Sequence, residues 1–183
     1  MALLLIPGQH LTKPWLFDAL GAALVAAGEW IRLWAVRHIG VISRTRSDRV
    51  GPLVATGPFA HVRNPLYIGN MALWVGFALS AHLLWLALLI AVVIGIEYHA
   101  IVRWEEHLLV SRRGDEYRAY MARVPRWMPT ATSRGGRDGD GLAIADRAAR
   151  PVAFSWRETF YSERGTLIAI AAGYLLLWVK SRL

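Results

Sequence analysis

Two clusters of polar side chains flank the longest uncharged stretch of the chain. The first lies in TGPFAHVRNPLYIGN, from Thr56 to Asn70, and the second in RWEEHLL, from Arg103 to Leu109. An arginine can grip an anionic group with its planar guanidinium, and a glutamate can accept hydrogen bonds from an ammonium or a hydroxyl group. Together the two clusters suit recognition of a small charged molecule, provided that the fold brings them to one place.

The stretch between the clusters is too long for a single membrane crossing. No Lys, Arg, Asp or Glu occurs from Pro65 to Ile96. One straight helix of that length would measure about 48 Å at about 1.5 Å per residue, against a hydrocarbon core of about 30 Å. We therefore expect a helical hairpin with helices 65–81 and 83–104, turning near His82. Because a hairpin returns both its ends to one membrane face, the two polar clusters should be neighbours in space.

The rest of the chain adds helices on either side of this hairpin. An apolar segment over 15–36 carries Glu29 and Arg32, which a helix places on one face as an ion pair. We expect a membrane core over 1–130, a flexible Gly-rich and charged linker over 131–150, and a C-terminal appendage over 151–183 with a short membrane helix at 165–180. The predicted fold class is all-α: a polytopic membrane helix bundle with a central hairpin and a cytoplasmic cofactor-binding segment.

Composition supports a membrane protein and excludes several kinds of site. Hydrophobic residues make up 55% of the chain although its formal charge is +8, so apolar and basic residues must be segregated along it, as a bilayer requires. Cysteine is absent, which excludes disulfides, thiolate metal sites and a cysteine nucleophile. No metal-ligand motif such as HExxH occurs, so we expect no metal cofactor. We expect membrane lipids as partners and no nucleic acid; the oligomeric state stays open.

Basic residues in the loops predict the topology. Eleven arginines lie just before or just after the hairpin: Arg37, Arg44, Arg46, Arg49, Arg63, Arg103, Arg112, Arg113, Arg118, Arg123 and Arg126. Positively charged loops stay on the cytoplasmic side of a membrane. We therefore expect an integral membrane protein with its N-terminus outside and its site on the cytoplasmic face.

Three blocks in order along the chain carry a resemblance to a known superfamily: GPFAHVRNPLYIG, EEHLLVSRRGDEYRAY and VPRWMP. Over about residues 50–130 the chain resembles the isoprenylcysteine carboxyl methyltransferases and phospholipid methyltransferases. The resemblance implies that S-adenosyl-L-methionine is held beneath a membrane-open substrate tunnel. It implies cofactor contacts by His61, Arg63, Asn64, Pro65, Tyr67, Glu105 and Glu106, with Arg63 and Glu106 as catalytic residues. Asn64 departs from the pattern, because the eukaryotic enzymes typically carry His before the Pro.

The expected function is methyl transfer from S-adenosylmethionine to a lipophilic small molecule or lipid. We favour O-methylation of a carboxylate like that of isoprenylcysteine, which is ionised at neutral pH and needs no base. Phospholipid-type N-methylation is the alternative; an amine must first lose a proton, and Glu106 or His61 would be the candidate base. A membrane reductase of the sterol type, which binds NADPH, shares related motifs but usually has more helices. A non-catalytic protein whose basic loops only anchor it to lipid is the remaining alternative.

Overall fold

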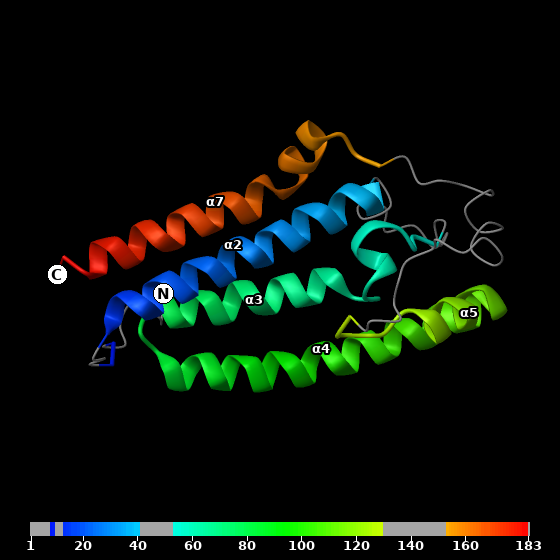
Figure 1. Ribbon diagram of the computed structural model, residues 1–183, viewed down its shortest axis with the longest axis horizontal. Coiled ribbons are helices and arrows are strands. Elements are labelled where there is room, and N and C mark those ends of the chain that lie inside the picture. The colour runs from blue at the N-terminus through cyan, green and yellow to red at the C-terminus, as the bar shows by residue number, and fades with distance from the viewer. Residues whose placement is uncertain (1–7, 10–12, 41–52, 130–152, 183) are drawn as a thin grey trace.

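The computed structural model describes residues 8–9, 13–40, 53–129 and 153–182. Its elements are α2 (Pro14–Ile39), the short 3₁₀ helix η2 (Gly57–Ala60), α3 (Pro65–Ser80), α4 (Leu84–Arg113), α5 (Asp115–Arg123) and α7 (Trp156–Lys180). No strand occurs among these residues, and the prediction of an all-α membrane helix bundle is confirmed. Figure 1 shows α7, α2, α3 and α4 side by side in that order.

The central hairpin forms as the sequence predicts. Pro65 is the first residue of α3, where its missing N–H costs nothing because no helical partner is available there. The turn after Ser80 places His82 in the left-handed region with a φ of 58°, and the Leu83 amide donates to the Ala78 carbonyl at 3.0 Å. The chain then reverses into α4, so the start of α3 and the end of α4 lie on the same side of the molecule (Figure 1).

Helix α4 is longer than the predicted 83–104, because it continues to Arg113. Six of the nine residues from Glu105 to Arg113 are polar, but the nine include neither Gly nor Pro, and most of them are good helix formers. Polarity marks where a helix leaves an apolar environment, whereas Gly114, with a φ of 57°, ends the helix itself. Glu105 and Glu106 therefore lie within the helix, which gives them fixed directions.

Helices α2 and α3 pack backbone to backbone through small residues. A Cβ added at Gly28 would lie 2.7 Å from the Gly69 carbonyl oxygen, and one added at Gly21 would lie 2.6 Å from that of Gly76. Such close approach of glycine faces is a common way for membrane helices to associate. This packing holds α2 rigidly beside the hairpin.

Helix α4 presents an apolar face that no other described element covers. Leu88, Val92 and Ile96 on this helix are 71%, 59% and 67% exposed. Within the described residues, α2 and α4 are long and apolar enough to cross a membrane, while α3 is a shorter apolar helix. Lipid is the natural cover for a face of this kind.

Helix α7 begins nine residues before the predicted 165–180. Ser155 and Glu158 form a capping box, in which the Glu158 amide donates to the Ser155 hydroxyl and the Glu158 carboxylate accepts from the Ser155 amide. The first turns of α7 are polar, so a search of the sequence for apolar segments does not detect them. Helix α7 packs against α2. The predicted linker over 131–150 lies outside the described residues.

Candidate functional site

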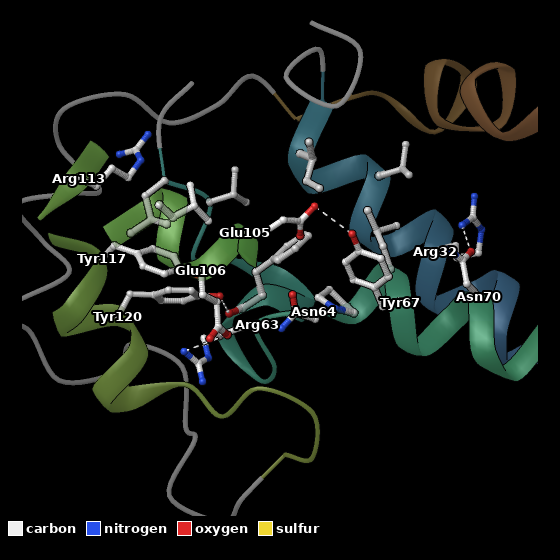
Figure 2. A pocket seen from close by; sticks show the side chains of 18 of the residues that line it. Arg32, Arg63, Asn64, Tyr67, Asn70, Glu105, Glu106, Arg113, Tyr117 and Tyr120 are labelled. Atoms are coloured by element: carbon white, nitrogen blue, oxygen red, sulfur yellow. Dashed lines mark hydrogen bonds and ion pairs between the residues drawn. The ribbon is translucent and has the colours of Figure 1, made fainter. Parts of the chain in front are cut away.

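A cavity of about 720 Å³ opens where the two ends of the hairpin meet. Sites for small molecules typically have volumes of about 300–1,000 Å³. Its walls come from α2, the segment 53–64 with η2, and helices α3, α4, α5 and α7 (Figure 2). The residues predicted to contact a cofactor that line it are Arg63, Asn64, Pro65, Tyr67, Glu105 and Glu106.

The hairpin thus brings the two polar clusters together. His61 is the exception: it is exposed, does not line this cavity, and lies beside Trp34 with ring centroids 6.2 Å apart. It follows η2 directly, where the chain turns before reaching Arg63.

The Glu106 carboxylate lies between two guanidinium groups. Arg63 Nη1 is 3.2 Å from Glu106 Oε1, and Arg126 Nη2 is 2.6 Å from Glu106 Oε2. Glu106 is only 4% exposed. Arg63 lines the cavity beside this carboxylate, so its guanidinium is also placed to contact an anionic group of a ligand.

Not all donor groups of the Arg63 guanidinium are satisfied within the part of the chain that the structure describes. Its Nε and Nη1 atoms are buried without a hydrogen-bond partner among the described residues, although Nη1 lies within ion-pair distance of Glu106. Buried donors in proteins are almost always satisfied, so a group left unsatisfied points to a partner that the chain does not supply. The loop is held firmly, because the Arg63 amide donates to the Pro125 carbonyl at 2.9 Å.

Tyr67 and Glu105 make a second polar pair on the cavity wall. The Tyr67 hydroxyl donates to Glu105 Oε1 at 2.9 Å, as the dashed line in Figure 2 shows. The Tyr67 ring also packs on the ring of Tyr98, with centroids 4.8 Å apart. One Glu105 oxygen remains for a ligand, and the contact with Tyr98 orients the Tyr67 ring.

Helix α5 contributes two buried tyrosines that the sequence reasoning did not select. Tyr117 and Tyr120 line the cavity, and the Tyr120 hydroxyl donates to the Phe59 carbonyl at 2.8 Å, which ties α5 to η2. Burial, with a further contribution from the Glu106 carboxylate, raises the pKa of Tyr117 to about 12. Burial also raises the pKa of Tyr120 above its usual range. Both phenols are therefore neutral at physiological pH and offer aromatic faces to a ligand.

A signal for these tyrosines was present in the sequence. Their i, i+3 spacing places them on one face of a helix that begins at Asp115. The sequence does not mark Arg126 as a site residue, because it lies among the basic residues of a loop. Only the packing of that loop against α4 brings its guanidinium to Glu106.

At its other end the cavity is bounded by Arg32, Asn70 and Glu163. Arg32 donates to the Asn70 side-chain oxygen, and its Nη2 is 2.5 Å from Glu163 Oε2. The predicted pair with Glu29 is confirmed, with Arg32 Nε 3.5 Å from Glu29 Oε2. Glu163 belongs to α7, which the sequence had placed in a separate appendage. Figure 2 shows Arg32 and Asn70 at the opposite end of the site from Tyr117 and Tyr120.

Comparisons with known proteins identify the family of this chain. The phospholipid methyltransferase family matches residues 16–114, from the first turn of α2 to the end of α4. The nickel-cobalt-cadmium resistance protein NccN of Alcaligenes xylosoxydans xylosoxydans is 34% identical over 110 residues, which cover 60% of this chain and 47% of that protein. The cobalt-zinc-cadmium resistance protein CzcN of Cupriavidus metallidurans is 28% identical over 110 residues, covering 60% and 46%.

The chain therefore spans about half the length of the curated relatives it matches. No solved structure matches it. Within the described residues, no group of three or more His, Asp or Glu side chains could hold a metal ion. The family match extends over more than half of the 183 residues and includes both polar clusters. This chain belongs to the phospholipid methyltransferase family.

Proposed function

We propose that the protein is a membrane methyltransferase that binds S-adenosylmethionine in the cavity between α3, α4 and α5 and methylates a lipophilic acceptor. The observation that carries the proposal is the buried Arg63 guanidinium on the cavity wall, whose Nε and Nη1 lack hydrogen-bond partners among the described residues. The methionine carboxylate of the cofactor is an anion that could satisfy them.

The other cavity residues suit the remaining groups of the cofactor. The Glu105 oxygen that does not bind Tyr67 can accept from the ammonium or a ribose hydroxyl. Arg126, which is not among the residues that line the cavity, pairs with Glu106. The faces of Tyr117 and Tyr120 can pack against adenine. When bound, the cofactor supplies a methyl group activated by its positively charged sulfur.

The work left to the protein is alignment and exclusion of water. Correct placement of two reactants can contribute about 7–11 kcal/mol to lowering a barrier. Glu106 is engaged by two guanidiniums, so we assign it to positioning Arg63 and Arg126. Glu105 and Tyr67, joined by a hydrogen bond, fix the adjoining wall.

The test of the cofactor is a binding experiment on detergent-purified protein. S-adenosylmethionine, or its demethylated product, should raise the thermal unfolding temperature, whereas NADPH should not. Stabilisation by NADPH alone would contradict the methyltransferase assignment and favour a reductase of the sterol type.

The chemistry of the acceptor is tested on the product. We retain O-methylation of a carboxylate like that of isoprenylcysteine and N-methylation of a lipid amine as the two acceptor chemistries. Membranes that hold the protein would be supplied with methyl-labelled cofactor, and the lipid extract then treated with strong base. A methyl ester releases volatile labelled methanol, while the label of an N-methyl group stays in the non-volatile fraction, because base does not cleave its C–N bond. Label that never enters the lipid fraction would contradict a lipophilic acceptor.

A further inference from the structure

The two arginines beside Glu106 do not share its carboxylate equally. Arg126 Nε donates to Oε1 at 3.1 Å and to Oε2 at 3.2 Å, and Arg126 Nη2 donates to Oε2 at 2.6 Å. Arg63 Nη1 lies 3.2 Å from Oε1, but neither Nη1 nor Nε of Arg63 makes a hydrogen bond among the described residues. A guanidinium that meets both oxygens of a carboxylate makes a particularly strong contact. The hydrogen bonding to Glu106 therefore comes from Arg126, and Arg63 keeps donors for another group.

The two arginines also differ in what else they face. Arg63 and Glu106 line the cavity, whereas Arg126 is not among its lining residues. The side chain of Arg126 is 28% exposed, against 9% for that of Arg63. A ligand in the cavity would thus meet the Arg63 guanidinium and not that of Arg126.

The backbone fixes both arginines relative to one another. The Arg63 amide donates to the Pro125 carbonyl at 2.9 Å, and the Asn64 side-chain amide donates to the Arg126 carbonyl at 3.3 Å. These two contacts join the segment before α3 to the segment after α5, and neither involves the Arg126 side chain. Replacing that side chain should therefore leave the two segments joined.

Loss of Arg126 would change the partner of Glu106. This carboxylate is 4% exposed, and a buried carboxylate that lacks donors is costly. Of its two arginines only Arg63 would be left, so the Nε and Nη1 hydrogens of Arg63 would turn to Glu106. A ligand anion would then have to compete with Glu106 for them.

We propose that Arg126 is a positioning residue for the cofactor site: by binding both oxygens of Glu106, it leaves the Arg63 guanidinium available to the carboxylate of the ligand. This inference rests on the proposed function, because the ligand that Arg63 would meet is S-adenosylmethionine. Arg126 lies beyond the residues matched by the family model, so the match assigns it no role.

The test is a pair of variants measured by binding of labelled S-adenosylmethionine to detergent-purified protein. Arg126→Gln should weaken binding about tenfold to a hundredfold, as expected when Arg63 gives up one charge-assisted hydrogen bond to the ligand. Adding Glu106→Gln should return the affinity to within about threefold of the wild type, because a neutral amide does not draw the guanidinium away. A residue that only shapes the loop, or that contacts the ligand itself, would not be rescued in this way.

A second measurement does not depend on the cofactor. Phenylglyoxal modifies arginine side chains, and mass spectrometry of peptides measures its rate at Arg63 in the ligand-free protein. The rate should fall in Arg126→Gln, where Glu106 engages Arg63, and return in the double variant. If Arg126→Gln does not fold, Arg126→Lys takes its place, because a lysine keeps the charge but cannot meet both oxygens as a guanidinium does.

An exposed ion pair on α5 provides the matched control. Arg118 Nη1 is 2.8 Å from Asp115 Oδ1, and neither residue lines the cavity. Arg118→Gln, alone and with Asp115→Asn, repeats the two charge removals away from the site. Cofactor affinity and Arg63 labelling should both stay as in the wild type.

The outcomes separate this inference from the proposed function. Wild-type cofactor affinity in Arg126→Gln, or a double variant that binds as weakly as the single one, would overturn the positioning role while the cofactor site stands. If the wild type does not bind S-adenosylmethionine, the proposed function fails, and the labelling decides alone: a rate that falls and returns supports the positioning role, and an unchanged rate overturns it.

Discussion

Replacement of Arg63 by alanine is the sharpest test of the cofactor site. The side chain is almost wholly buried, its Nη1 is 3.2 Å from Glu106 Oε1, and two of its nitrogens lack hydrogen-bond partners. If those groups grip the cofactor carboxylate, the substitution removes at least one charge-assisted hydrogen bond, which contributes about 1.5–3 kcal/mol. The dissociation constant should rise by roughly 10- to 150-fold.

The structure indicates that this variant still folds. Glu106 keeps its ion pair with Arg126, in which Nη2 is 2.6 Å and Nε 3.1 Å from the carboxylate. No unpaired buried carboxylate is therefore left behind, and a loss of 3–5 kcal/mol, typical of a broken buried pair, is not expected. A monodisperse elution profile and an unfolding temperature close to that of the wild type would confirm this.

The assay is equilibrium binding of labelled S-adenosylmethionine to detergent-purified protein. Arg63→Lys tests whether the planar fork matters, and should bind almost as weakly as Arg63→Ala, because a lysine cannot make the paired contacts of a guanidinium. Arg112→Ala is the control, since Arg112 is exposed at the end of α4 and does not line the cavity. Equal affinity of the wild type, Arg63→Ala and Arg112→Ala would refute the assigned site.

Three further predictions follow from the fold. Tyr120→Phe leaves a carbonyl of η2 without its donor, and should lower the free energy of unfolding by about 1–3 kcal/mol; an unchanged denaturation midpoint would count against the contact. Gly28→Ala forces α2 away from α3 and should destabilise by about 1–3 kcal/mol, whereas Gly165→Ala, which has open space, should not; thermal unfolding in detergent compares the two. Because the chain has no cysteine, Arg112→Cys and His82→Cys can be labelled singly with an impermeant maleimide in intact cells; we expect His82→Cys alone to react, and labelling of Arg112→Cys would contradict a cytoplasmic site.

Much of the architecture could be predicted from local patterns. The uncharged stretch that begins at Pro65 exceeds one membrane thickness, so a reversal was required, and the only polar residues in its middle lie near His82. That reversal dictates that Arg63 and Glu106 approach one another, as they do. The predicted end of α4 at residue 104 is wrong, because a loss of hydropathy does not by itself end a helix, which continues to Arg113.

Side chains that meet across long sequence distances could not be found in this way. Arg126 reaches Glu106 only because a loop without regular structure folds back against α4, and helix periodicity carries no information about such a loop. Tyr117 and Tyr120 share a helical face that the spacing predicts, but which wall they line depends on how α5 docks.

The sequence by itself determined the hairpin, the membrane character and the meeting of the two polar clusters. Hydropathy and helix length are local properties, and the fixed thickness of a bilayer then limits where a helix of given length must end. Only the tertiary structure decided that Glu163 lies against Arg32, 131 residues earlier in the chain. That contact depends on which faces of α2 and α7 pack together. Packing requires two complementary surfaces, so the sequence of either helix alone does not predict it. The apolar cavity between α3 and α7 exists for the same reason.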